Sequence, residues 1–241
     1  MVELYRNSGL DLYEKVHYSK AEHIAEVDAI LQWYPRRGVK VLDIGCSGGL
    51  HALDFARRGF RVAGFDIEPS AIRRARKRNR DRGLGVCFRV LDLERGAMTD
   101  LGRFDLIYSI ANVMAHVYKY RLIQVLRKIR ECLEPGGILL FDVLVLDPPF
   151  RQDIYDRRLN IRWKRRISAP GGKIFMEASL ADSGMIQRFD VWGYYLNEIC
   201  EILQIAGFDR IEYSDRLDFA RSRPRPPHAV SLFFRIGSST A

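Results

Sequence analysis

Residues 41–49 read VLDIGCSGG, an apolar run that contains one acid, Asp43, and ends in a turn rich in glycine. The apolar run predicts a buried strand. The glycines predict a tight turn at which a ligand can lie against bare backbone, and a helical pattern begins directly after them. The stretch therefore has the strand–turn–helix order of a site that binds a ligand at the N-terminus of a helix.

The glycines do not have the spacing of a dinucleotide site. Such a site needs Gly-x-Gly-x-x-Gly, so that a pyrophosphate can approach the backbone. Counting from Gly45, the second and third glycine positions hold Ser47 and Leu50. The carboxylate of Asp43, just before the turn, would also oppose a phosphate. It suits a ligand with a cationic end instead, such as an amino-acid ammonium.

Two more acids end the next two apolar runs. Asp66 closes FRVAGFD (60–66), where its carboxylate can accept hydrogen bonds from both hydroxyls of a ribose. Asp92 stands near the end of GVCFRVLDL (85–93), where it can accept one from an adenine amino group. In open α/β sheets the carboxyl ends of the strands face the ligand crevice, so we expect the three acids to meet at one edge.

Apolar runs alternate with helical patterns up to residue 145. This rhythm predicts a parallel sheet with right-handed crossovers and helices on both faces. The expected strands lie at 39–44, 60–66, 85–93, 104–110 and 137–145, and the expected helices lie near 51–58, 69–82 and 119–133.

The remainder of the chain has a different pattern. Residues 147–193 contain LNIRWKRRI and KIFMEASL, whose alternation predicts a small antiparallel insertion beside the carboxyl edge of the sheet. A helix is expected over 194–208, followed by strands at DRIEY and AVSLFFRI. We expect one domain over 1–241, with a cofactor-binding core (19–146), an insertion that caps the substrate (147–193) and a C-terminal helix and strands (194–241).

The chain resembles the class I S-adenosylmethionine-dependent methyltransferases. The matching pieces are VLDIGCSGG, GFDIEPSAIRRAR, RVLDLE, FDLIYSIANVMAHV and LEPGGILLFD, in family order and spacing. The resemblance implies an α/β, Rossmann-like fold, with a seven-stranded, mostly parallel sheet whose last strand is antiparallel. It also implies S-adenosyl-L-methionine as the cofactor. Ser47 stands where the family usually has glycine, and a side chain this small should still fit.

The resemblance also implies the roles of individual residues. Gly45, Ser47 and Gly49 would lie beneath the methionine part of the cofactor, Asp66 would hold the ribose, and Asp92 with Leu93 would hold the adenine. The full set of expected cofactor-binding residues is Asp43, Gly45, Cys46, Ser47, Gly49, Asp66, Ile67, Asp92, Leu93 and Ser109. No metal is expected, because a sulfonium methyl is already a good electrophile and the protein mainly aligns the reacting atoms.

The segment SIANVMAHV follows the expected fourth strand and carries the candidate catalytic residues. Asn112 and His116 resemble the GN…AH pattern of glycine N-methyltransferase-like and other small-molecule enzymes of this class. Asn112 could orient a substrate, and His116 could take a proton from the nucleophile. Alternatively, both residues tie the loop to the next helix.

The segment LDPPF (146–150) resembles the loop with which amino-group methyltransferases of DNA and RNA hold a flipped base. In family order that loop follows the fourth strand, whereas DPPF follows the fifth. We therefore interpret the two prolines as the end of a strand, at which the chain turns into the insertion.

The chain has 39 Lys and Arg against 30 Asp and Glu, a formal net charge of +9. This excess favours acidic partners in general. The cluster RWKRR (162–166) lies in the insertion, where its cations either recognise a carboxylate or phosphate on the substrate or face water.

The leading prediction is methyl transfer to nitrogen or oxygen of a small molecule, which could be acidic. One alternative is an RNA or protein methyltransferase that docks its partner on the basic surface; nucleic acid is not favoured. Another is a non-catalytic protein that binds adenosylmethionine. Four dispersed cysteines, the lack of an apolar run near ~20 residues and the lack of a signal peptide predict a cytoplasmic protein without a membrane partner. The oligomeric state stays open.

Overall fold

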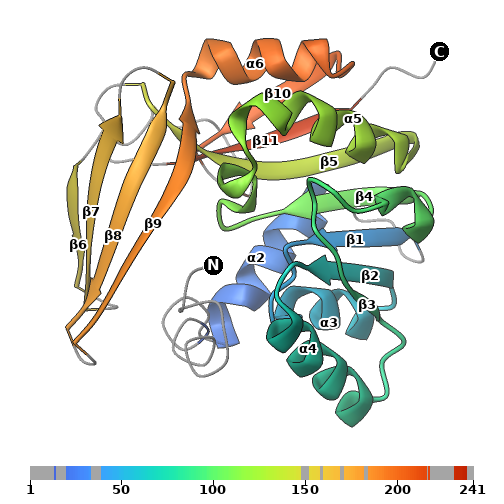
Figure 1. Cartoon of the computed structure of the whole chain (residues 1–241). Coiled ribbons are helices and arrows are strands. Elements are labelled where there is room, and N and C mark those ends of the chain that lie inside the picture. Colours follow the sequence, from blue (N-terminus) through green and yellow to red (C-terminus); the bar gives the residue numbers. More distant parts are fainter. Residues whose placement is uncertain are drawn as a thin grey trace.

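The computed structural model describes Glu14 and residues 20–33, 39–147, 152–157, 160–168, 171–181, 184–215, 217 and 231–237. In these residues a central sheet is flanked by helices, and a group of long strands extends from one side of it (Figure 1). The predicted α/β class is therefore confirmed.

The parallel part of the central sheet has the strand order β3-β2-β1-β4-β5. On the far side of β5, β11 runs antiparallel to it and pairs with β10. The expected mostly parallel sheet with an antiparallel last strand is confirmed. Its strands are β1 (Lys40–Ile44), β2 (Arg61–Asp66), β3 (Cys87–Val90), β4 (Phe104–Ser109), β5 (Leu133–Val145), β10 (Arg210–Ser214) and β11 (Ser231–Gly237).

Apolar cores lie on both faces of this sheet. Leu42 of β1 belongs to one cluster and Val41 to the other, as the alternation of strand side chains requires. Burial of each such side chain stabilises the fold by about 1.5–3 kcal/mol. The first cluster is covered by α5 (Leu122–Glu131) and α6 (Leu196–Ile205), and the second by α2 (Lys20–Trp33), α3 (Leu50–Arg57) and α4 (Pro69–Arg82).

The helices begin and end at residues with clear local causes. In α4 the side chain of Glu68 accepts the N–H of Ser70 at 3.0 Å, and Pro69 occupies the first turn. Gly83 ends the helix in the left-handed region, with φ at 62°. The Glu68 cap fixes the start of α4 close to Asp66, the last residue of β2.

Several predicted boundaries are wrong. The third strand spans Cys87–Val90 rather than 85–93, so Asp92 lies beyond its end. The fifth strand begins at Leu133 rather than at residue 137, because Leu133 pairs with Phe104 before a register shift between the two strands. The last helix begins at Leu196 rather than at Tyr194, because Tyr194 is the last residue of the preceding strand.

The predicted antiparallel insertion is present. It consists of β6 (Asp153–Asp156), β7 (Ile161–Ser168), β8 (Lys173–Leu180) and β9 (Met185–Tyr194), each antiparallel to its neighbour. The patterns in the sequence had indicated the second and third of these strands. We call the four strands the extension; in Figure 1 they stand to one side of the central sheet.

The extension joins the central sheet at the end of β5, where Leu144 pairs with Gly193 and Val145 with Tyr194. One edge of β5 is paired with β11 up to Leu144, and the other is paired with β4 up to Phe141. β9 therefore pairs with the same edge of β5 as β4 does, beyond the point where the pairing with β4 ends. This connection places the extension beside the loop that follows β4.

The segment LDPPF is described up to Asp147. Oδ2 of Asp147 accepts the N–H of Leu196 at 2.8 Å, which connects the end of β5 to the start of α6. Residues 148–150 lie outside the described part of the chain. None of the described helices is long and apolar enough to cross a membrane.

Candidate active site

A cavity of about 460 Å³ opens at the carboxyl edge of the parallel strands. Its walls include the two acids expected for the ribose and the adenine, Asp66 and Asp92, together with His116. The volume lies within the range of about 300–1,000 Å³ that small-molecule and cofactor sites have. The structure therefore brings together residues from three strand ends.

Asp66 is held by backbone groups on both sides. Its Oδ2 accepts the N–H of Ser47 and its Oδ1 accepts the N–H of Glu68, each at 2.9 Å. A carboxylate oxygen has two acceptor positions, so each oxygen keeps one for a ligand hydroxyl. Burial raises the pKa of Asp66 above its ordinary value. The arrangement fits a ribose with two adjacent hydroxyls.

Asp92 lies two residues beyond the end of β3 and is fixed in the same way. Its Oδ1 accepts the N–H of Glu94 at 2.8 Å and that of Arg95 at 3.3 Å. Both backbone bonds go to one oxygen, so Oδ2 can accept from an adenine amino group. Ile67 and Leu93 line the same cavity, and Ile67 is 49% exposed, as expected of an apolar side chain that a ring would cover.

The glycine turn lies against the loop that follows β4. Gly45 has φ at 75°, and a Cβ on it would lie 2.6 Å from Cγ2 of Val113. Both facts exclude a larger residue. Ser47 also has a positive φ, 47°, a backbone conformation that glycine adopts with less strain than serine does.

A narrower crevice shares Gly45 and Ser47 with the cavity and contains Asp43, Cys46 and His51. Burial raises the pKa of Asp43 to about 6, and it raises the pKa of the Cys46 thiol well above its ordinary value. The thiol is therefore uncharged, and a buried carboxylate is the anion available to a cationic ligand group. The crevice fits the ammonium end that the sequence predicted.

Glu14 closes the crevice and was not predicted. Its carboxylate receives two hydrogen bonds from Arg78, at 2.8 and 2.7 Å, and forms an ion pair with Arg74 at 3.3 Å. Arg78 also donates to the carbonyl of Gly48 at 3.0 Å. A Cβ on Gly48 would lie 2.0 Å from Oε1 of Glu14, so this glycine is needed for the close approach. Glu14 is far from the motif in sequence, so spacing gave no signal for it.

Two expected cofactor residues lie outside both cavities. Gly49 faces the protein interior, because a Cβ there would lie 2.7 Å from Phe88 and 2.9 Å from Ala75. Ser109 is fully buried, and its hydroxyl donates to the carbonyl of Ile44 at 3.2 Å. Their surroundings give both residues a packing role beneath the site.

The loop after β4 is held by another acid that the sequence did not single out. Oδ1 of Asp142 accepts the N–H of Asn112 at 2.8 Å, and burial raises the pKa of Asp142 to about 7. Ala111 and Asn112 both have positive φ, 67° and 61°, so the backbone is strained here. The position of Asp142 inside the apolar run GILLFDVLV was the signal in the sequence that could have identified it.

His116 is the last residue of the short helix η3 (Val113–His116) and lines the cavity. Its ring stacks on Phe189 of the extension, with 5.9 Å between centroids and 27° between planes. Protein atoms around the ring displace water, which lowers the pKa of His116 below its ordinary value. The imidazole is therefore neutral near pH 7, the form that can accept a proton.

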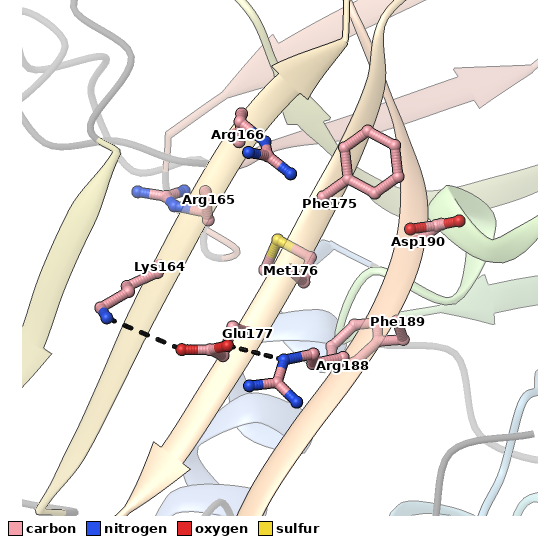
Figure 2. A pocket seen from close by; sticks show the side chains of 9 residues that line it. All are labelled: Lys164, Arg165, Arg166, Phe175, Met176, Glu177, Arg188, Phe189 and Asp190. Atoms are coloured by element: carbon pink, nitrogen blue, oxygen red, sulfur yellow. Dashed lines mark hydrogen bonds and ion pairs between the residues drawn. The ribbon is translucent and has the colours of Figure 1, made fainter.

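A second cavity, of about 560 Å³, lies on the extension, away from the strand ends (Figure 2). Charged and apolar side chains both line it. Glu177 lies 2.8 Å from Arg188 and 3.7 Å from Lys164, and the apolar lining residues are Phe175, Met176 and Phe189. It contains none of the strand-end acids, so the smaller cavity at the sheet edge is the stronger candidate for the cofactor. Within the described residues, no group of three or more His, Cys, Asp or Glu is placed to hold a metal ion.

Comparison with known proteins agrees with this geometry. Residues 41–137 match a family model described as a methyltransferase domain. The chain is 31% identical over 162 residues to the ubiquinone biosynthesis O-methyltransferase of Chelativorans sp. (strain BNC1), covering 64% of this chain and 61% of that one. It is 32% identical over 152 residues to that of Cereibacter sphaeroides, covering 62% and 60%. The chain thus spans less than two thirds of these relatives.

Solved structures share the fold over nearly the whole chain. The CcbJ methyltransferase from Streptomyces caelestis superposes with a TM-score of 0.75 at 14% identity, covering 98% of both chains. DesVI from Streptomyces venezuelae has a TM-score of 0.68 at 18% identity, covering 98% of this chain and 100% of that one. The motif order and the shared fold agree with the match of residues 41–137 to a methyltransferase domain.

Proposed function

We propose that this protein transfers the methyl group of S-adenosylmethionine to a nitrogen or oxygen of a small molecule, with His116 as the proton acceptor. The observation that carries the proposal is that His116 lines the same cavity as Asp66 and Asp92. A proton acceptor is thus within one cavity of the residues that suit the cofactor. The relatives from Chelativorans and Cereibacter are O-methyltransferases of ubiquinone biosynthesis, which supports a small acceptor.

The residues of the chain have distinct tasks in this proposal. When bound, S-adenosylmethionine supplies the electrophilic methyl group. Asp66 would accept the ribose hydroxyls, Asp92 the adenine amino group, and Asp43 would lie near the ammonium. The backbone bonds to Asp66 and Asp92 fix both carboxylates before binding, so little ordering is needed when the cofactor arrives.

His116 would act on the acceptor. Its lowered pKa keeps the ring neutral near pH 7, so it can take a proton from an ammonium or a hydroxyl as the nucleophile forms its new bond. The stacking on Phe189 fixes the plane of the ring. Asn112 holds the backbone of this loop through Asp142, and an orienting role for its side chain remains part of the proposal.

The basic helix α4 supports a small acceptor over a nucleic acid. Arg74 and Arg78 bind Glu14, and Arg76 donates twice to the carbonyl of Phe88, at 3.1 and 2.8 Å. These three guanidinium groups are engaged within the protein. A phosphate backbone would have to compete with those contacts.

Calorimetric titration with S-adenosylmethionine and S-adenosylhomocysteine tests the cofactor part. Micromolar binding is expected, and Asp66→Ala should weaken it about 100-fold or more, because two hydrogen bonds to a buried carboxylate are lost. Asp81→Asn, on the exposed face of α4, is the matched control and should bind as the wild type does. If the folded wild type binds neither ligand, the proposal fails.

A further inference from the structure

The narrow crevice beside the glycine turn is lined by Asp43 and also by the imidazole of His51. Asp43 lies on β1 and is 4% exposed, and His51 lies in the first turn of α3 and is 8% exposed. The glycine turn joins β1 directly to α3, so the fold brings both side chains to the same place. The crevice thus combines an acidic and a basic side chain where water is largely excluded.

Glu26 of α2 contacts His51 on the side away from the glycine turn. The helices α2 and α3 pack against each other on one face of the central sheet (Figure 1). Oε2 of Glu26 lies 2.7 Å from Nε2 of His51, a hydrogen-bond distance. A carboxylate in this position favours the positively charged form of the imidazole. We call Asp43, His51 and Glu26 the crevice triad.

The charge of Asp43 depends on groups from each element packed around it. Burial raises its pKa to about 6, and the positive charge of His51 acts in the opposite direction. The Tyr108 hydroxyl and the backbone N–H of Ala52 also lower this pKa, whereas the carboxylate of Asp66 raises it. His51 is therefore the cation that opposes burial.

The other members of the triad have titratable neighbours too. The ring of His23 meets that of His51 edge to face, with 6.1 Å between the centroids. Glu26 is close enough to Asp142 for its charge to raise the pKa of that acid, in addition to the effect of burial. Glu14 also lines the crevice, and two arginines of α4 bind its carboxylate. His51 is the group through which Glu26 acts on Asp43.

We propose that His51 is a positioning residue for the cofactor: held by Glu26, it keeps Asp43 charged to receive the ammonium of S-adenosylmethionine. The two carboxylates and one imidazolium of the triad leave one negative charge, which one ammonium balances. Without the imidazolium, Asp43 would keep its proton to a higher pH and the crevice would lack its anion. This inference rests on the proposed function and adds the group that sets the pH dependence of cofactor binding.

Two ligands separate the crevice from the rest of the site. S-adenosylhomocysteine has the amino-acid end, whereas 5′-methylthioadenosine has the same adenosine and sulfur but lacks that end. Both would place the ribose on Asp66, so titration of Asp66 affects the two ligands alike. The ratio of the two dissociation constants, measured by calorimetry between pH 5 and pH 8, therefore reports on the crevice.

The wild type should prefer S-adenosylhomocysteine at pH 7. The preference should fall as the pH drops below about 6, by up to about tenfold per pH unit, because Asp43 gains a proton. In His51→Gln the preference at pH 7 should be about 10-fold lower and its midpoint should move to higher pH. Affinity for 5′-methylthioadenosine should stay within about twofold, which also shows that the variant is folded.

Two further variants complete the test. Arg57→Gln is the matched control, because it removes another cation of α3, 66% exposed and paired with Asp54, and it should keep the wild-type profile. Glu26→Gln changes a side chain that is 39% exposed, so it tests the triad without altering a buried position. It should move the midpoint in the same direction as His51→Gln does, by a smaller amount, because the imidazole loses its charged partner.

The same titrations distinguish this inference from the proposed function. If His51→Gln keeps the wild-type midpoint, or if both ligands have the same pH profile in the wild type, the role of His51 is wrong and the proposed methyl transfer stands. Failure of the folded wild type to bind either ligand at any pH would overturn both.

Discussion

The carboxyl edge of the parallel strands, which we call the cofactor edge, and the extension differ in what decides where a side chain points. At the cofactor edge, Asp66, Asp92 and Asp142 each accept backbone N–H groups, so the local chain fixes where each carboxylate points. On the extension, the face of a side chain follows from strand register, so the adjacent Arg165 and Arg166 have opposite surroundings, the first buried and the second exposed. Sequence motifs therefore locate the side chains of the cofactor edge, whereas only the pairing of the strands shows which face of the extension a side chain lies on.

The largest effect is expected at His116, which joins the two regions. His116→Ala should lower kcat about 10²- to 10⁴-fold, because the proton acceptor is lost, and should leave S-adenosylhomocysteine affinity within about twofold. In the wild type, kcat/KM should fall on acidification, with a midpoint below about pH 6.5, as the imidazole gains a proton. An unchanged pH profile in the variant would contradict the role of His116.

The next effect concerns stability at the cofactor edge. The folded-state pKa of Asp142, about 7, lies above the ordinary value of 3.8, so the native protein binds the proton more tightly than the unfolded chain does. Stability should therefore fall as pH rises from about 4 to about 7. Asp142→Asn should remove this loss and be more stable than the wild type at pH 8, by a few kcal/mol in order of magnitude.

Urea unfolding of both proteins at pH 5 and pH 8 measures the difference. Asp43, whose pKa is raised to about 6, titrates in the same window in both proteins, so the comparison is made between the two at each pH. Equal stabilities at pH 8 would show that the Asp142 carboxylate is not held as the structure shows.

A smaller effect is expected from Gly48→Ala. The added Cβ would clash with the side chains of Glu14 and Arg78, both of which can move. The contact of Glu14 with the glycine turn should therefore be lost while the fold is kept. S-adenosylhomocysteine affinity should fall about 5- to 30-fold. Gly85→Ala is the control, because no atom lies within 4 Å of its Cβ position. Calorimetry that finds the two variants alike would exclude Glu14 from the site.

Asn112→Gly tests how far backbone geometry alone explains the loop after β4. Glycine adopts the positive φ of 61° without strain, and its backbone N–H can still donate the hydrogen bond to Asp142. If the side chain orients the acceptor, kcat/KM should fall about 10-fold, the value of one hydrogen bond in a site. A variant with wild-type kcat/KM would limit Asn112 to its main-chain role.

The smallest effect is expected on the solvent face of the extension. Glu177→Gln removes the ion pairs with Arg188 and Lys164, both of which have exposed side chains. Stability should change by less than about 1 kcal/mol and kcat by less than about twofold. A large loss of activity, measured in the same assay, would mean that this face takes part in function and would remove the contrast between the two faces.

The sequence predicted the central sheet because each of its signals is local. An apolar run with an acid at its end and a glycine turn specifies strand, edge and loop within ten residues, as Asp43 and Gly45 show. The antiparallel extension was also predictable, because the sequences of β7 and β8 show the residue alternation of half-exposed strands.

What the sequence could not predict depends on contacts between distant segments. Glu14 reaches the glycine turn from 34 residues before Gly48, and Phe189 reaches His116 from another strand group. Ser109 falls at a strand end like the acids do, yet its hydroxyl is turned into the sheet. Arg165 and Arg166 are chemically identical neighbours, and only the pairing of β7 with β8 distinguishes them.

The connection between the extension and the central sheet has a consequence for how such a protein can change over evolution. β9 meets β5 through two residue pairs, Leu144 with Gly193 and Val145 with Tyr194. Because the backbone pairing between the two is this short, changes within residues 152–192 are expected to leave the pairing of β1 to β5 intact and to alter only the side-chain contacts of the extension, such as that of Phe189 with His116. The extension can therefore be replaced, by nature or by grafting, without rebuilding the parallel sheet that carries the strand-end acids.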